Sequence, residues 1–306
     1  MKKFLIKLIP YVFGLIILHL FWSTYADGNT DENYRRFTVE NSNNMIIGDS
    51  RSAQGIIPQI LSENINDSQF FNFSFNIAES PYGTIYLEAI KKRIDKHTKE
   101  GIFIVSVNPW SITTIRNPDD KEYFSEEEVS CLRNMHFYDL KINYEYLIKN
   151  YNKSWYFLYR DSEKSGIRSK SYLHKNGWLE INIDMDSTEV EKRFVTKIKD
   201  YQEYAKSKKI SKTRTDALKE TIKFLQEHGK VFLVRLPTSK SIVEIEKNTY
   251  PESDVIFTKL SSELNVKYFN FLNEYADYQY TDGNHLYKES SKILTKKIAD
   301  SVNKYK

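Results

Sequence analysis

The chain has 306 residues, enough for one large domain or two small ones with a proper hydrophobic core. Its 45 basic and 41 acidic side chains give a formal charge of +4, a balance too even to indicate nucleic-acid binding. A content of 40% apolar and 28% charged residues is that of a globular protein rather than a disordered chain. The single cysteine, Cys131, excludes an intramolecular disulfide. No histidine has the spacing of a zinc site, so we expect no metal and no cofactor.

The first element is an apolar stretch, residues 4–22, that follows a basic N-terminus. Two interpretations are open: a signal anchor covering residues 1–25, or a signal peptide cleaved at residues 24–26. We favour the anchor because Trp22 and Tyr25 suit a membrane interface and Tyr25 suits cleavage poorly. Both interpretations place the rest of the chain outside the cytoplasmic membrane. We therefore predict a single-pass protein that contacts this membrane through residues 4–22.

The next stretch, residues 26–43, is polar without an apolar period, and we interpret it as a tether. From residue 44 onward, short apolar runs alternate with helical patterns, which is typical of a parallel sheet flanked by helices. The predicted strands are residues 45–47, 70–75, 102–107, 231–234 and 266–272. Because these runs are apolar on both faces, they fit strands covered by helices on both sides.

Three helices are predicted between and after these strands. A helix over 81–97 opens with the cap and first-turn pair Ser80-Pro81. A second helix, 215–228, stops at Gly229 as its C-cap. The last helix covers 288–302. Its apolar stripe consists of Ile293, Leu294, Ile298 and Val302.

The long connection after the third strand, residues 110–211, is rich in Tyr, Lys, Asp and Trp and has no clear period. A connection of that length inside a compact domain is usually functional or forms a subdomain. We interpret it as a lid or substrate-binding insertion within a domain that covers residues 44–306. Its aromatic rings suit the faces of a carbohydrate.

Two short motifs carry candidate chemistry. Gly48-Asp49-Ser50 directly follows the first predicted strand, and ligands of parallel sheets bind at the carboxyl ends of strands. Near the C-terminus, Asp282 and His285 stand three residues apart before the last helix. That spacing lets the carboxylate bind one imidazole nitrogen while the other takes a proton from a serine hydroxyl. Each motif alone also fits an ordinary loop or Asx turn.

Two further segments follow the second and third strands. The side-chain amide of Asn108 is placed to stabilise an oxyanion, although Asn108-Pro109 is also a common strand-to-loop breaker. The turn over 76–80 offers backbone N–H groups that can add a second donor. A phosphate-binding loop at 48–50 is excluded because the Gly-x-x-x-x-Gly-Lys spacing is missing.

The order of these blocks resembles the SGNH/GDSL hydrolase superfamily: serine after the first strand, a turn after the second, asparagine after the third and Asp-x-x-His before the last helix. The resemblance runs from about residue 45 to residue 302, apart from the insertion. It implies a flavodoxin-like three-layer α/β/α fold with a mostly parallel five-stranded sheet, preceded here by a transmembrane helix.

The resemblance also implies roles for individual residues. Ser50 is similar to the family's nucleophile, His285 to its general base and Asp282 to the residue that orients the base. The oxyanion hole that it implies consists of Ser50, Ala78 and Asn108. Two positions depart from the family pattern: Ala78 stands where the family usually has Gly, and a proline follows Asn108 where the family typically has Asp.

The layout further resembles the membrane-anchored SGNH proteins of bacterial envelopes that move acyl groups on polysaccharides. We assign substrate contacts to Arg51, Trp110 and Trp178. The expected function is that of a serine esterase or O-acyltransferase acting on acyl esters, above all acetyl esters, of an extracytoplasmic polysaccharide or on a small acyl ester. A membrane-bound acyl-donor protein is the expected further partner. The alternative is a non-catalytic SGNH-shaped envelope protein that binds polysaccharide or scaffolds its assembly.

Overall fold

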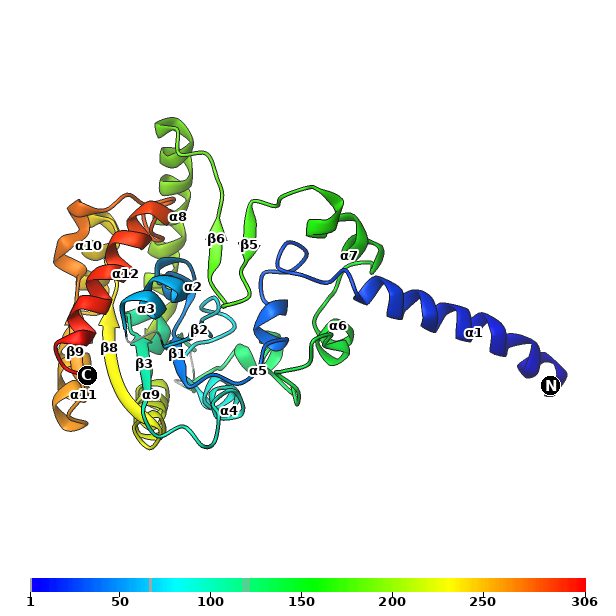
Figure 1. The fold of residues 1–306 in the computed structure, drawn as a ribbon. Coiled ribbons are helices and arrows are strands. Elements are labelled where there is room, and N and C mark those ends of the chain that lie inside the picture. Colours follow the sequence, from blue (N-terminus) through cyan, green and yellow to red (C-terminus); the bar gives the residue numbers. More distant parts are fainter. Residues whose placement is uncertain (1, 66–67, 118, 120) are drawn as a thin grey trace.

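The structure is a computed structural model that describes residues 2–65, 68–117, 119 and 121–306. At its centre lies a five-stranded parallel sheet of order β2-β1-β3-β8-β9 (Figure 1). The strands are β1 (Asn44–Ile47), β2 (Phe70–Asn72), β3 (Gly101–Ser106), β8 (Gly229–Arg235) and β9 (Lys267–Asn270). The predicted parallel α/β sheet is confirmed, although β2 is shorter than the run that predicted it.

Helices cover both faces of this sheet because successive strand residues point to opposite sides. Phe103 and Val105 of β3 lie in a core with α4 (Thr84–Arg93), α9 (Lys212–Gln226) and α11 (Ser253–Glu263). Ile104 of the same strand lies in a second core with α3 (Pro58–Asn64) and α12 (Lys288–Asn303). Three layers result, as the sequence predicts.

The carboxyl ends of the strands meet at one edge, where new helices begin. The helix α2 (Ser50–Gly55) follows β1, and α10 (Lys240–Thr249) follows β8. Between β1 and α2, Gly48 has a φ of +156°, and a Cβ there would lie 2.4 Å from Ser52 Oγ and 2.7 Å from Ser106 Cβ. Only glycine fits this crossing between β1 and β3.

The region between β3 and α9 has its own small elements. Its two ends pair as the antiparallel strands β4 (Thr113–Ile115) and β7 (Lys208–Ile210), and a hairpin forms from β5 (Ser171–Leu173) and β6 (Leu179–Ile181). Its helices are α5 (Glu126–Val129), α6 (Tyr144–Lys149), α7 (Tyr156–Arg160) and α8 (Ser187–Ser207). The described part of the chain also contains the 3-10 turns η1 (Tyr34–Phe37), η2 (Pro109–Ile112), η3 (Glu163–Ser165) and η4 (Leu272–Asp277).

The segment 26–43, expected as a polar tether, packs against the domain. Arg36 is 1% exposed and donates hydrogen bonds to the carbonyls of Asn72 (3.3 Å) and Gly177 (3.0 Å). The amide of Asn29 donates to the carbonyl of Asp161 at 2.7 Å. The polar side chains of this segment donate hydrogen bonds to backbone carbonyls of other segments. Packing of this kind produces no apolar period in the sequence.

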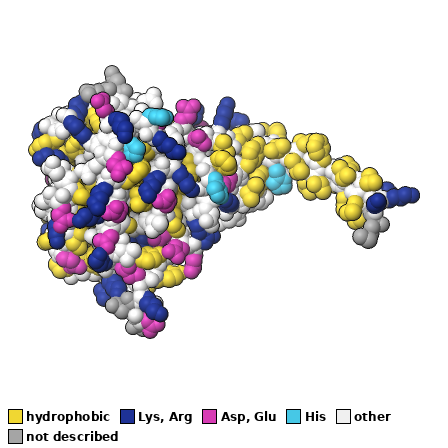
Figure 2. Space-filling model, turned by 90° about the horizontal axis from the view of Figure 1, so that it is seen from below, with side chains coloured by type: hydrophobic (Ala, Val, Ile, Leu, Met, Phe, Trp, Pro, Cys, Tyr) yellow, Lys and Arg dark blue, Asp and Glu magenta, His cyan; other side chains and the backbone are white. Residues whose placement is uncertain are grey.

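The N-terminal helix α1 (Lys2–Ser23) projects away from the domain with its apolar side chains exposed (Figures 1 and 2). Its length and composition are sufficient to cross a membrane. At the domain end of α1, the ring centres of His19 and Trp155 are 4.7 Å apart, and Trp155 directly precedes α7.

Several details of the predicted helices are wrong, among them the end of α4, which is Arg93 rather than residue 97, and the start of α9, which is Lys212 rather than residue 215. The helix α4 begins at Thr84 rather than at Pro81, because the hydroxyl of Ser80 donates to the carbonyl of Gly48 (2.8 Å) instead of capping a helix. Gly229 is the first residue of β8 rather than a C-cap, and it pairs with the start of β3. Ile293 lies outside the apolar stripe of α12 because its side chain faces solvent and is 60% exposed.

The two isoleucines of α12 give a matched test of this packing. Ile298 is completely buried against the sheet, so we expect Ile298→Ala to lower the free energy of unfolding by about 2–5 kcal/mol. The exposed Ile293→Ala variant should stay within about 0.5 kcal/mol of the wild type. Urea denaturation of both variants measures the difference. Equal losses would contradict the orientation of α12.

Candidate active site

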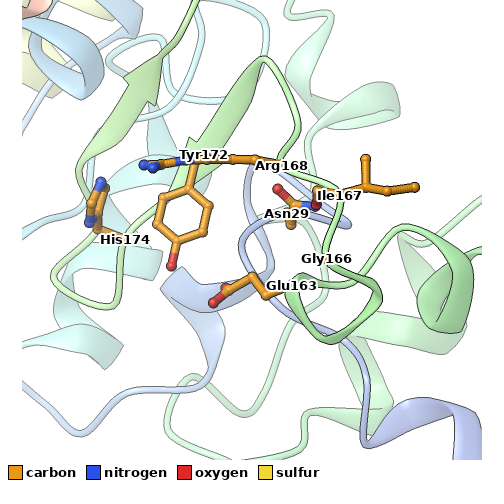
Figure 3. Close-up of a pocket in the computed structure, with 7 residues that line it drawn as sticks. All are labelled: Asn29, Glu163, Gly166, Ile167, Arg168, Tyr172 and His174. Atoms are coloured by element: carbon orange, nitrogen blue, oxygen red, sulfur yellow. The ribbon is translucent and has the colours of Figure 1, made fainter.

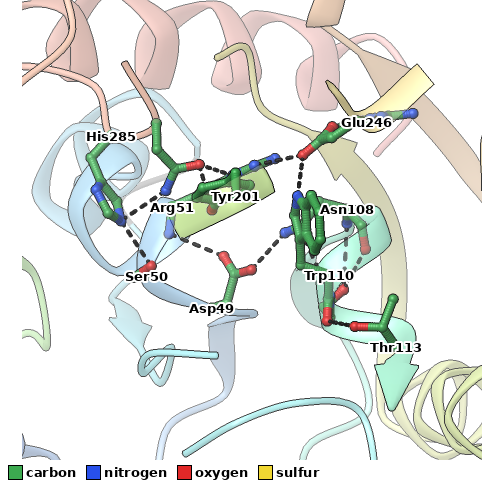
Figure 4. Close-up of polar contacts among 12 residues, drawn as sticks. Asp49, Ser50, Arg51, Asn108, Trp110, Thr113, Tyr201, Glu246 and His285 are labelled. Atoms are coloured by element: carbon green, nitrogen blue, oxygen red, sulfur yellow. Dashed lines mark hydrogen bonds and ion pairs between the residues drawn. The ribbon is translucent and has the colours of Figure 1, made fainter. Parts of the chain in front are cut away.

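Ser50 and His285 lie 235 positions apart in sequence and meet at the carboxyl edge of the sheet (Figure 4). Ser50 Oγ is 2.9 Å from His285 Nε2, and His285 Nδ1 is 2.9 Å from Asp282 Oδ2. An ionised carboxylate only accepts hydrogen bonds, so Nδ1 carries the proton and Nε2 presents its lone pair to the serine hydroxyl. The structure therefore places the three predicted catalytic residues in one hydrogen-bonded row.

The carboxylate of Asp282 is well supplied with donors. Its Oδ1 accepts the backbone N–H groups of Asn284 and His285, both at 2.9 Å. Burial alone raises the pKa of Asp282, but the imidazole and the two backbone donors outweigh it and hold this pKa below its ordinary value. Asp282 is therefore ionised at neutral pH, as an orienting partner of the histidine must be.

The turn that carries Asp282 and His285 is covered by α8 of the insertion. Gly283 has a φ of +83°, and a Cβ there would lie 2.5 Å from the ring of Phe194. The Nζ atom of Lys197 lies 3.8 Å from Asp282 Oδ2. Arg193 Nε donates to the carbonyl of Thr281 at 2.8 Å. Glycine is needed in this turn both for its left-handed backbone and for the close approach of α8.

The predicted oxyanion donors differ in their surroundings. Asn108 is buried at the end of β3, and its Nδ2 donates to Asp49 Oδ2 at 2.6 Å. The N–H of Ala78 donates to the side-chain oxygen of Asn76 at 2.8 Å within an Asx turn. That bond directs the Ala78 amide to its own loop, so the geometry gives no support to Ala78 as an oxyanion donor.

The three residues assigned to substrate contact are all largely buried. Arg51 is 3% exposed, and its Nη2 pairs with Glu246 Oε1 at 2.6 Å. Trp110 is 1% exposed and donates from Nε1 to the same oxygen at 2.7 Å. Trp178 is 9% exposed and donates to the carbonyl of Gln54 at 2.9 Å. Each of these side chains packs the domain, so their burial gives the assignment to substrate contact no support.

The buried carboxylate of Glu246 is the centre of an ionic network beneath the site (Figure 4). Besides Arg51 and Trp110, it binds Arg235 Nη2 through Oε2 at 2.9 Å. Burial raises the pKa of Glu246, but the two guanidinium groups outweigh it and lower this pKa from its ordinary value. Sequence reasoning missed Glu246 because nothing in α10 marks one glutamate as buried.

Two more residues of the site were missed. Asn284, between Asp282 and His285, has its Nδ2 3.1 Å from His285 Nε2 and its Oδ1 2.9 Å from Arg51 Nε. Tyr201 of α8 donates its hydroxyl to the same Oδ1 at 2.8 Å. The position of Asn284 inside the Asp-x-x-His motif was a usable signal, whereas Tyr201 lies in a segment with no motif.

A separate hollow of about 350 Å³ lies in the insertion (Figure 3). The residues that line it are Asn29, Glu163, Gly166, Ile167, Arg168, Tyr172 and His174. None of them belongs to the Ser50–His285–Asp282 row. Among the described residues, no group of three or more His, Cys, Asp or Glu side chains is arranged to hold a metal ion.

No protein-family model matches the sequence, and no curated protein matches it at a significant level. Among solved structures, the inhibitor-bound aryl esterase of M. smegmatis is similar with a TM-score of 0.39 and 9% identity, over 85% of this chain and 98% of that chain. A carbohydrate acetylesterase from Sinorhizobium meliloti gives the same four values. An acetyl xylan esterase from Butyrivibrio proteoclasticus has a TM-score of 0.33 and 9% identity, over 87% of this chain and 64% of that chain. Likeness at this level assigns no activity, so the function rests on the geometry of the site.

The ionic network is testable through Glu246. The Glu246→Gln variant leaves two buried guanidinium groups without their carboxylate, so we expect a loss of about 3–5 kcal/mol in the free energy of unfolding. On the same helix, the 60% exposed Glu244→Gln is the control and should change stability by less than about 0.5 kcal/mol. Denaturant titration of both variants gives these values.

The pH dependence of stability tests whether Glu246 is ionised in the folded protein. Because the pKa of Glu246 is depressed in the folded state, its contribution is present above the unfolded-state pKa and is lost as the pH falls through the folded-state pKa. The difference between the wild type and Glu246→Gln should therefore be full at pH 7 and shrink only in strong acid. A difference that grows on acidification would contradict the ionised state.

Proposed function

We propose that this chain is an SGNH-type serine esterase in which Ser50 is the nucleophile, His285 the general base and Asp282 its orienting partner. The observation that carries the proposal is the row of hydrogen bonds from Asp282 Oδ2 through the imidazole to Ser50 Oγ, with each link 2.9 Å long. A nucleophile, a base and a carboxylate at these distances form the arrangement that activates a serine hydroxyl.

The reaction follows from this geometry. Ser50 Oγ attacks the ester carbonyl carbon while His285 Nε2 takes the hydroxyl proton, and Asp282 stabilises the imidazolium. The tetrahedral intermediate collapses when its bond to the leaving alkoxide breaks and the imidazolium returns the proton to that oxygen. An acyl-Ser50 ester remains. Water, or a sugar hydroxyl in a transferase, then attacks this ester through the same base and releases Ser50.

The negative oxygen of the tetrahedral intermediate needs donors near Ser50. Ser50 is the first residue of α2, and the first N–H groups of a helix have no partner within the helix. The amide nitrogen of Asn108 carries two hydrogens, of which one is bonded to Asp49. We assign the Ser50 N–H and the second Asn108 N–H to the oxyanion, and we leave Ala78 out of this set.

The proposed substrates are acyl esters, above all acetyl esters, on an extracytoplasmic polysaccharide. Two features support this choice: an apolar helix α1 that suits a membrane anchor, and an insertion whose helix α8 lies beside the triad. The Arg193 and Lys197 side chains of α8 contact the catalytic turn and are charged and partly exposed. As a transferase, the enzyme would take its acyl group from a membrane-bound donor protein or a small acyl ester.

The role of Ser50 is tested by chemical labelling. We expect a fluorophosphonate probe to modify wild-type protein at Ser50, and Ser50→Ala to lower kcat for p-nitrophenyl acetate by about three to six orders of magnitude. Ser207→Ala, which removes an exposed serine hydroxyl at the end of α8, is the control and should keep full activity. Folded wild-type protein that is not labelled at Ser50 would instead favour the non-catalytic polysaccharide-binding alternative.

The role of α1 as an anchor is tested by extraction. Full-length protein should stay with the bacterial cytoplasmic membrane in alkaline carbonate, and its intact mass should include residues 1–25. Phe13→Arg combined with Ile16→Arg should release it, since each central charge costs about 2.5–3.5 kcal/mol of insertion free energy. The control Val255→Arg, at an exposed position on α11, should leave the protein in the membrane. A mature N-terminus at residue 27 would show a cleaved signal peptide instead.

A further inference from the structure

The side-chain amide of Asn284 binds the catalytic nitrogen of His285. Asn284 Nδ2 lies 3.1 Å from His285 Nε2, the same atom that lies 2.9 Å from Ser50 Oγ. Two groups therefore converge on the one lone pair that has to accept the serine proton. The proposed mechanism uses only one of them.

The orientation of this amide is fixed by its other end. Asn284 Oδ1 lies 2.9 Å from Arg51 Nε, which can only donate, so the atom facing Arg51 is the oxygen and the atom facing His285 is the nitrogen. Tyr201 donates its hydroxyl to the same oxygen at 2.8 Å. Rotation of the amide by half a turn would place its N–H groups against the Arg51 N–H, so the amide cannot exchange its ends.

Arg51 itself has no freedom to follow such a rotation. Its Nη2 is paired with Glu246 Oε1 at 2.6 Å, and the carboxylate of Glu246 is fully buried. The guanidinium also lies 5.9 Å from the centre of the Tyr201 ring. The orientation of Asn284 is thus set by a charge pair in the core of the domain.

We propose that Asn284 is a positioning residue that disfavours the protonated form of His285. With neutral imidazole, the Asn284 N–H donates to the Nε2 lone pair and keeps the ring in place beside Ser50. Once Nε2 carries a proton, two N–H groups face each other and this hydrogen bond is lost. The inference rests on the proposed function, and its consequence is an imidazolium that returns its proton readily to the leaving group.

Other charged groups lie around the turn of His285 or follow it along the chain, and they have to be counted. The carboxylate of Asp282 lies at Nδ1 and favours imidazolium, while Lys197 of α8 lies 3.8 Å from that carboxylate and opposes it. Lys288, at the start of α12, is held by Glu180 of β6 at 3.0 Å. None of these groups contacts Nε2, so substitution of Asn284 leaves their arrangement in place.

The test compares two substitutions at one position. Asn284→Asp keeps the shape and the acceptor for Arg51 but places an anion beside Nε2, so the acid limb of the kcat/KM–pH profile should move up by about 1–3 pH units. Asn284→Ala removes the donor to His285 together with the acceptor for Arg51 and Tyr201 and adds no charge, so it should move the acid limb up by no more than about one unit. Asn303→Asp, at the exposed end of α12, is the charge control and should leave the profile unchanged.

A second readout does not require turnover. Diethylpyrocarbonate modifies only unprotonated imidazole, so peptide mass spectrometry of the full chain gives the pH dependence of modification at His285. The midpoint pH of modification should shift in the same direction as the kinetic limb. It should be highest in Asn284→Asp, lower in Asn284→Ala and lowest in the wild type. If folded variants lose rate uniformly while neither midpoint moves, Asn284 is merely structural and the proposal is overturned. If the wild type has no esterase activity, the proposed function fails, and the modification experiment still decides the role of Asn284.

Discussion

The buried carboxylate of Glu246 is the constraint on which the geometry of the site depends. It binds Arg51, which follows Ser50 in α2, Arg235 at the end of β8, and Trp110 just after β3. These partners come from three strand ends that must meet for a parallel sheet to form an active site. Two guanidinium groups and an indole N–H compensate for the loss of water around a fully buried anion. The network therefore couples assembly of the sheet edge to placement of Ser50.

The insertion contributes side chains that contact the turn carrying Asp282 and His285. Its ends are joined by β4 and β7, and α8 then packs on the turn that carries Asp282 and His285. Phe194 lies against Gly283, and Tyr201 reaches Asn284 beneath it. Through these contacts α8 supports the turn that carries His285 and forms one side of the site.

Much of the central domain could be predicted because its strands are apolar on both faces, and short runs of this kind between helical patterns are typical of a covered parallel sheet. The row of Ser50, Asp282 and His285 followed from motifs at strand and helix ends. Burial of Arg36, Arg51 and Trp110 could not be predicted, since each of them binds partners far along the chain. The helix α8 was missed although Val190, Phe194, Ile198, Tyr201 and Ala205 recur at helical spacing. Its many charged residues mask this stripe.

The connection from Glu246 to Ser50 passes through alternating partners: anion, guanidinium, amide, imidazole and hydroxyl. Each member fixes the polarity of the next, because a guanidinium only donates and an amide has one accepting and one donating end. The tautomer of His285 is therefore defined from both sides, by Asp282 at Nδ1 and by the core, through Asn284, at Nε2. Hydrogen bonds in a low-dielectric interior strengthen one another. A charge buried beneath the sheet edge can in this way favour the protonation state that a serine nucleophile requires.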